Sequence, residues 1–201
     1  MLSLGLSCSA YDGVAQLFAE ESGDLFNSLS YSARYEMLNN FTQGKNAEVM
    51  NNFRTTESRI LQLSHEHMIV ATSSGKTVEL KLFPISKTDT VIAVIETVAT
   101  PVKDSYLSFY DMKWKQLDAS QFIVMPQLED FFLPKAPKDQ CEELARQLSF
   151  AMIEMHFEGD NLVARCNLND FYMGDDFGHY KHLVTPSVVY ILQKGKFKKK
   201  K

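Results

Sequence analysis

The chain has 201 residues, of which 45% are hydrophobic and 23% are charged, a composition typical of one globular domain that needs no disulfide or metal to support its core. It contains no run of about 18 apolar residues, so the sequence excludes a membrane-spanning helix. The net charge of −4 conceals an acidic body, because residues 194–201 hold six of the 21 Lys and Arg residues, and an acidic body argues against a nucleic-acid-binding surface.

The first ten residues (1–10) resemble the end of a secretory signal peptide. Cys8 and Ala10 are small residues of the kind that precede signal cleavage, but the basic start and the full apolar stretch of such a peptide are missing. We interpret the segment as a truncated leader, with the mature protein beginning near Tyr11, and this predicts export to the periplasm or the cell surface. A lipoprotein acylated at Cys8 is the weaker alternative, because Gly5 stands where such signals have leucine.

Two helices are predicted in the N-terminal third of the chain. An apolar stripe at helical spacing predicts the first over 14–18, and the second is expected to run from an N-cap at Ser30 or Ser32 through Phe41. The segment 42–53 indicates a break followed by a short helical turn.

From residue 58 onward the apolar period changes to two, which is typical of strands. A helix with Asp139 as its N-cap is expected at 138–149, between two groups of strands. The pattern predicts an α+β fold with an antiparallel sheet of about eight strands, two layers thick, and helices packed on one face. We expect a single domain over 11–197 and a solvated basic tail at 198–201. The expected strands lie at 58–64, 67–72, 77–83, 90–99, 105–110, 119–126, 153–157, 162–168 and 187–193.

The segment 101–118 is dense in aromatic and charged residues and contains the only tryptophan of the chain. Strand alternation places Tyr106 and Tyr110 on one face and Leu107 on the other, and the charges mark the ends of the strand and the turn toward Trp114. The segment is therefore predicted to be a hairpin. Tyr106, Tyr110 and Trp114 remain candidates for an exposed aromatic platform that binds a protein or sugar.

A second candidate site lies in 170–183, which is rich in Asp and His. In a helix, three of these side chains would recur at three- to four-residue spacing and could hold a divalent ion: Asp175 or Asp176, His179 and His182. Gly174 and Gly178 argue against a stiff helix, and acidic residues early with histidines late are also what a helix dipole favours. A metal-dependent hydrolase at this cluster is therefore an alternative and not the leading hypothesis.

Two pairs of side chains could also carry chemistry. His65 and His67 are expected on the same face of a strand, a geometry that some metal sites use, although no third ligand is identifiable. Cys141 and Cys166 fall on the core faces of a helix and a strand. In an exported protein they could form a disulfide, or both could remain buried thiols.

No sequence motif of a serine hydrolase, a metalloprotease or a phosphate-binding loop is present. The sequence therefore favours a non-enzymatic exported module, with an interaction or structural role, over an enzyme. No cofactor is indicated, and a protein or glycan of the envelope is the expected kind of partner. A carrier with an apolar cavity between sheet and helices is a further alternative.

Three segments carry a resemblance to a known family: 80–118 with the aromatic hairpin, the sequence LEDFF at 128–132, and VVYILQKGKF at 188–197. They resemble a family of small proteins of Bacteroides-type bacteria that is known only as a domain of unknown function, number 3256. The likeness covers residues 25–197. It implies export through an N-terminal signal, and it supplies no catalytic residues.

Overall fold

The structure is a computed structural model, and it describes residues 12–21, 23–53, 56–99, 102–148, 152–167, 178 and 180–200. Within these ranges the chain forms three α-helices, three short 3-10 helices and eleven strands. The helices are α1 (Gly13–Glu20), α2 (Tyr31–Thr42), η1 (Ala119–Gln121), η2 (Leu128–Phe131), α3 (Lys138–Gln147) and η3 (Lys181–Leu183).

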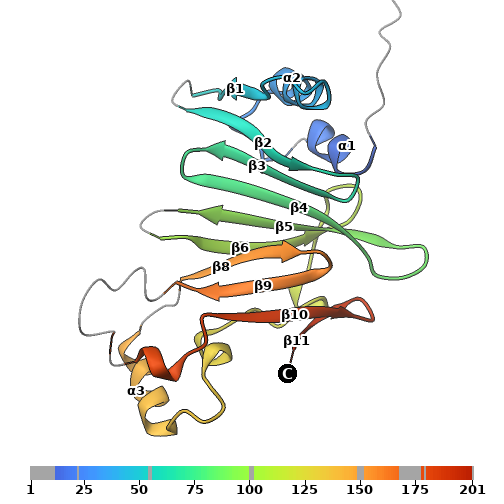
Figure 1. Cartoon of the computed structure of the whole chain (residues 1–201). Helices are drawn as coiled ribbons and strands as arrows, with labels where there is room; N and C mark the ends of the chain where they lie inside the picture. Colours follow the sequence, from blue (N-terminus) through green and yellow to red (C-terminus); the bar gives the residue numbers. More distant parts are fainter. Residues whose placement is uncertain are drawn as a thin grey trace, which may run out of the picture.

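The strands make two antiparallel sheets (Figure 1). The larger sheet follows chain order: β1 (Glu48–Met50), β2 (Glu57–Leu63), β3 (His67–Ser73), β4 (Lys76–Pro84), β5 (Thr90–Val98), β6 (Asp104–Tyr110) and β7 (Gln116–Leu117). The smaller sheet has the order β11-β10-β9-β8, from β8 (Ile153–Glu158), β9 (Asn161–Cys166), β10 (Ser187–Gln193) and β11 (Lys196–Lys199). The predicted α+β antiparallel class is confirmed, with the strands divided between two sheets.

Helices α1 and α2 cover one face of the larger sheet, near β1 to β4 (Figure 1). The predicted cap at Ser30 is confirmed, because its Oγ accepts a hydrogen bond from Ala33 N at 3.2 Å. Val14 and Phe18 of α1 are fully buried and belong to the same core cluster as the apolar side chains of the sheet beneath. This cluster is the first of two cores.

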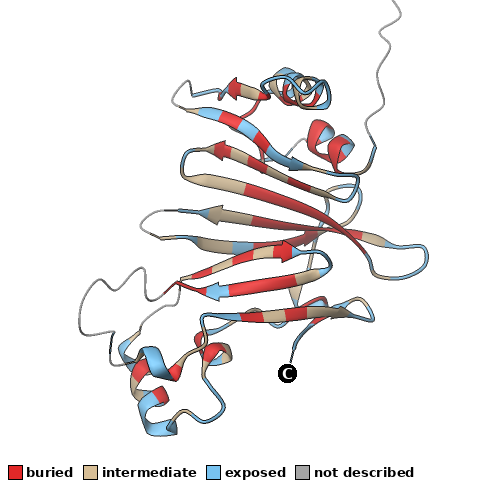
Figure 2. Ribbon diagram, viewed as in Figure 1, coloured by how far each residue is buried: buried red, intermediate tan, exposed pale blue. Residues whose placement is uncertain are grey.

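The second core lies on the opposite face of the larger sheet, against the smaller sheet, η2 and α3. Phenylalanine rings from both sheets meet there, with Phe83 5.1 Å from Phe157 and 5.0 Å from Phe197 between centroids. Strand β5 contributes to both cores, because Ile92 belongs to the first and Ile95 to the second. The run without alternation at 90–99 is therefore a central strand covered on both faces, as predicted, and Figure 2 shows the buried stretch along it.

Two local predictions are wrong. Residues 48–50 form strand β1 and not a helical turn, because the backbone pairs with β2 from Glu48 opposite Arg59 to Met50 opposite Glu57. Residues 119–126 begin with η1 and not a strand, because Asp118 Oδ1 accepts a hydrogen bond from Ser120 N at 3.0 Å and caps a tight turn.

Two boundaries also differ from expectation. The N-cap of α3 is Pro137, so Asp139 lies in the first helical turn, where the helix dipole stabilises its negative charge. Strand β11 takes in Lys198 and Lys199, and the Lys199 ammonium binds the backbone carbonyl and the carboxylate of Asp130. Part of the expected tail is therefore held in the smaller sheet.

None of the helices in the described part of the chain is long and apolar enough to cross a membrane.

Candidate functional site

Strand β6 separates its side chains as the alternation predicted. Leu107 and Phe109 are each 1% exposed and belong to the core between the sheets. Tyr106 is 61% exposed and Tyr110 is half-buried, and both point to the other face because they lie an even number of residues apart. The tyrosines therefore share the face of the sheet on which α1 and α2 pack.

A tight turn after β6 sets the position of Trp114. Asp111 Oδ1 accepts hydrogen bonds from Lys115 N at 3.0 Å and Lys113 N at 2.8 Å, and Trp114 N donates to Asp111 O at 3.0 Å. The backbone donors of Lys115 and Lys113 lower the pKa of the Asp111 carboxyl. Trp114 has a φ of 62°, a left-handed conformation that is unfavourable for a bulky residue and tends to occur at functional sites.

Tyr110 and Trp114 come together beside an open pocket of about 500 Å³. Their rings meet edge to face, with centroids 5.5 Å apart and an interplanar angle of 65°. The structure thus brings two of the three predicted platform residues together, whereas Tyr106 is not among the described residues that line the pocket. The remaining lining residues are Glu21, Gly23, Asp24, Leu25, Glu96 and Lys113.

Two of the three carboxylates in the lining are engaged by cations. Glu21 is buried, lies 3.5 Å from the guanidinium of Arg34, and accepts a hydrogen bond from Gly23 N at 2.6 Å. Desolvation lowers the pKa of Arg34, against the opposing effect of Glu21. Glu96 pairs with the ammonium of Lys76 at 2.5 Å. The carboxylates of Glu21 and Glu96 are therefore held in place before any ligand binds.

Two buried polar groups of β6 and the turn after it have no hydrogen-bond partner among the described residues. They are Nε1 of Trp114 and Oγ of Ser108, and both atoms are buried. Ser108 is 2% exposed and lies between Tyr106 and Tyr110 on the same face of β6. Buried polar groups in folded proteins almost always have a partner, either protein or ordered water, so each of these two groups needs an explanation.

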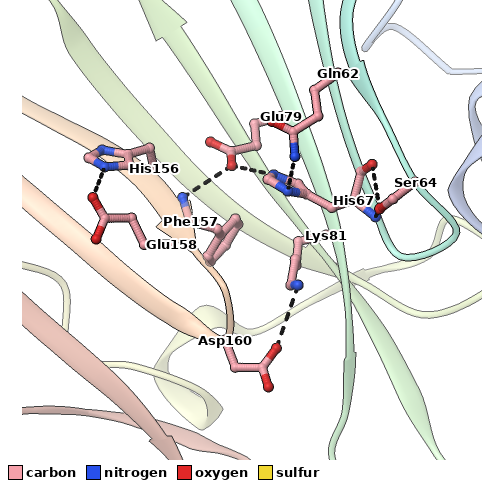
Figure 3. Close-up of polar contacts among 9 residues, drawn as sticks. All are labelled: Gln62, Ser64, His67, Glu79, Lys81, His156, Phe157, Glu158 and Asp160. Atoms are coloured by element: carbon pink, nitrogen blue, oxygen red, sulfur yellow. Dashed lines mark hydrogen bonds and ion pairs between the residues drawn. The ribbon is translucent and has the colours of Figure 1, made fainter.

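A separate polar cluster lies where the two sheets meet (Figure 3). His67 Nε2 is 2.5 Å from Glu79 Oε1, and the side chains are only 12% and 7% exposed. Gln62 Nε2 lies 3.0 Å from His67 Nδ1 on the other side of the ring. Lys81, also buried, reaches Asp160 of the β8–β9 turn at 3.5 Å.

This cluster continues into the edge of the smaller sheet. Three backbone N–H groups of β8, those of Ile153, Met155 and Phe157, donate to side chains of the larger sheet and not to a neighbouring strand. Their acceptors are Asp104 Oδ1 at 2.9 Å, Ser105 Oγ at 2.9 Å and Glu79 Oε1 at 3.1 Å, respectively. We call this contact between β8 and the larger sheet the seam. Without the seam, these backbone N–H groups at the edge of the smaller sheet would have no hydrogen-bond acceptor.

The His67 ring carries no catalytic arrangement in the part of the chain that is described. The hydroxyl of Ser64 donates to the backbone carbonyl of His67 at 3.1 Å and not to the ring, so Ser64 is not oriented as an activated nucleophile. The prediction that His65 and His67 share a strand face is wrong. His65 lies in the bend between β2 and β3, where its carbonyl accepts from Val14 N at 3.0 Å.

Most of the predicted metal cluster lies outside the part of the chain that the structure describes. Asp175, Asp176 and His179 lie outside the described residues, as do residues 1–10, while His182 Nε2 lies 3.2 Å from Gln140 Oε1. No three His, Cys, Asp or Glu side chains gather around a common point within the described ranges.

The two predicted core cysteines are buried. Cys141 and Cys166 belong to the core cluster between the sheets and form no disulfide with each other. Burial, with a smaller effect of Asp139, raises the pKa of the Cys141 thiol, which disfavours the thiolate that a nucleophile requires.

Sequence reasoning missed most of the pocket lining. Glu21 and Asp24 precede Trp114 by about 90 residues, and no local pattern connects such distant positions. The position of Glu96 is predictable from the sequence, because a charged residue that follows a continuous apolar run marks the place where a central strand leaves the core.

Comparison with known proteins gives a family and a fold. A family model described as protein of unknown function (DUF3256) matches residues 8–197. The solved structure of a domain of an uncharacterized protein from Porphyromonas gingivalis W83 is similar to this chain, with a TM-score of 0.82 and 22% sequence identity over 94% of this chain and 99% of that one. No curated protein matches the sequence. The structural likeness shows that the two chains share a fold.

Proposed function

Because the chain belongs to the DUF3256 family, a family of unknown function, we propose its function from its own geometry: a non-enzymatic binding module that holds a ligand against Tyr110 and Trp114. The ligand is a component of the cell envelope, where we propose that the protein resides.

One observation carries this proposal: the rings of Tyr110 and Trp114 meet edge to face, with centroids 5.5 Å apart, at the side of an open pocket of about 500 Å³. Pockets of about 300–1,000 Å³ that combine aromatic surface with a few polar groups are typical of ligand sites. The left-handed backbone of Trp114 adds to this support, since such strain is typical of ligand sites.

The pocket can be tested directly, because Trp114 is the only tryptophan of the chain and its fluorescence reports on this site alone. We expect titration with neutral oligosaccharides or short peptides to shift the Trp114 emission with at least one probe. Replacement of Tyr110 by leucine, which keeps an apolar side chain against the core, should weaken this response by about tenfold or more, because the stacking surface is lost.

The matched control is Tyr106→Ser, which removes an exposed tyrosine from the same strand face outside the pocket. It should leave the response unchanged. If no probe of either kind changes the Trp114 emission, or if Tyr110→Leu responds like the wild type, the proposed site is wrong.

Export is supported by the leader-like residues 1–10 and is tested by the mature N-terminus. We expect the protein recovered from cells to begin near Tyr11 and to lie in the envelope fraction, because signal peptidase removes the leader. N-terminal sequencing checks this. An intact Met1 in the cytosolic fraction would contradict export.

A further inference from the structure

We infer that the pocket beside Trp114 takes a neutral sugar residue. This inference rests on the proposed function, since it names the ligand class of the same site. It follows from the balance of charges around the pocket, from its hydrogen-bonding groups, from its aromatic rings and from its shape.

The charges around the pocket cancel. Its lining has three carboxylates, and three cations match them: Arg34 beside Glu21, Lys76 beside Glu96, and Lys113 in the lining itself. Because the carboxylates and the cations are equal in number, an ionic ligand would lose hydration without gaining a net counter-charge. The pocket therefore favours a neutral ligand.

The hydrogen-bonding groups suit a ligand that both donates and accepts. The ammonium of Lys113 in the lining can only donate, whereas the carboxylates of Asp24 and Glu96 can only accept. A hydroxyl group does both, so a polyhydroxylated ligand can satisfy all of them in one orientation. An apolar ligand would displace water from the Asp24 carboxylate without replacing its hydrogen bonds.

The aromatic pair suits the remaining surface of a sugar ring. Tyr110 and Trp114 meet edge to face at 5.5 Å, so the rings do not cover each other as they would in a stacked pair. A pyranose has an apolar C–H face and a polar rim of hydroxyls, and amphipathic aromatic residues complement such a combination.

The shape of the pocket argues against a peptide. Recognition of an extended peptide uses an open strand edge or a long groove. The described lining comes from the loop after α1, the turn after β6, and β5 and β6, which are both internal strands of the sheet. A compact pocket between two turns therefore fits one or two sugar rings better than an extended backbone.

The inference is tested with neutral hexasaccharides built on glucose, mannose, galactose or N-acetylglucosamine, and with hexalysine and hexaglutamate as charged probes. At least one neutral hexasaccharide should shift the Trp114 emission, and its affinity should change less than about twofold between 0.05 M and 0.5 M salt, because no net charge is neutralised. The charged peptides should have no effect.

Two variants sharpen the test, with binding measured by calorimetry. Trp114→Phe keeps an aromatic ring but reduces its surface, and it should weaken sugar binding about threefold to tenfold. Its thermal stability should not fall, because the substitution removes an orphan donor. Asp24→Asn keeps an oxygen acceptor and should hold sugar affinity within about threefold of wild type, whereas it would sharply weaken a cationic ligand.

The outcomes separate this inference from the proposed function. Binding of hexalysine without any hexasaccharide, with strong salt dependence and a large loss in Asp24→Asn, would overturn the sugar assignment and leave the binding site in place. Equal sugar affinity in Trp114→Phe and wild type would overturn the role of the Trp114 ring. If neither these probes nor the peptides above perturb Trp114, the proposed function fails as well.

Discussion

Replacement of Glu79 by alanine is expected to lower the free energy of unfolding by about 3–5 kcal/mol, the cost typical of removing one partner from a buried polar pair. The Glu79 carboxylate accepts from the backbone N–H of Phe157 and contacts the His67 ring. Its loss would leave a strand amide and an imidazole buried without a partner at the seam. Urea unfolding followed by circular dichroism measures the change, and hydrogen exchange should show a less protected Phe157 amide.

Two controls separate the seam from a general effect of losing a glutamate. Glu79→Gln keeps an oxygen acceptor and should cost clearly less than alanine. Glu57→Ala removes an exposed glutamate from β2 and should change stability by less than about 0.5 kcal/mol. If Glu79→Ala is as stable as Glu57→Ala, the carboxylate does not hold the two sheets together.

Gly13→Ala is expected to cost about 3 kcal/mol or more, because two penalties combine. Gly13 has a φ of 57°, and a Cβ added there would lie 2.1 Å from the carbonyl oxygen of His65. To relieve that clash α1 must move away from the β2–β3 turn, which breaks the hydrogen bond from Val14 N to His65 O. Thermal and urea unfolding measure the loss.

Gly159→Ala is a matched control, because Gly159 has the same φ of 57° and no atom lies within 4 Å of the added Cβ. It should cost only the backbone penalty, about 1–2 kcal/mol. The difference between the two variants measures the close contact of α1 with the turn. Equal losses would show that this contact contributes nothing.

The parts of the fold that could be predicted from sequence are those set by local patterns. The alternation in 105–110 places Leu107 and Tyr110 on opposite faces, and the structure agrees. The continuous apolar run of β5 and the cap at Ser30 were likewise visible, because period and capping are properties of neighbouring residues.

The parts that could not be predicted depend on contacts between distant segments. Strand β1 exists only through its pairing with β2, so its own residues do not show it. The hairpin pattern predicts the aromatic pair of the candidate site, Tyr110 and Trp114. Glu21 lines the same pocket but comes from a loop about 90 residues earlier in the chain, so no local pattern indicates it. The division into two sheets depends on the side chains that accept hydrogen bonds from the backbone of β8. One of them is Glu79, which lies 78 positions before its donor Phe157 in the sequence.

The seam also determines which alignment of the smaller sheet is possible. The three donors of β8 are alternate residues, 153, 155 and 157, whose apolar side chains enter the core. A slip of one residue would turn these side chains to solvent and aim the amides away from their acceptors, and a slip of two would leave an acceptor without its donor. The side-chain oxygens of Asp104, Ser105 and Glu79 thus fix the register of β8 against the larger sheet. Although β8 has no backbone hydrogen-bond partner on that side, it has one permitted position along its neighbour.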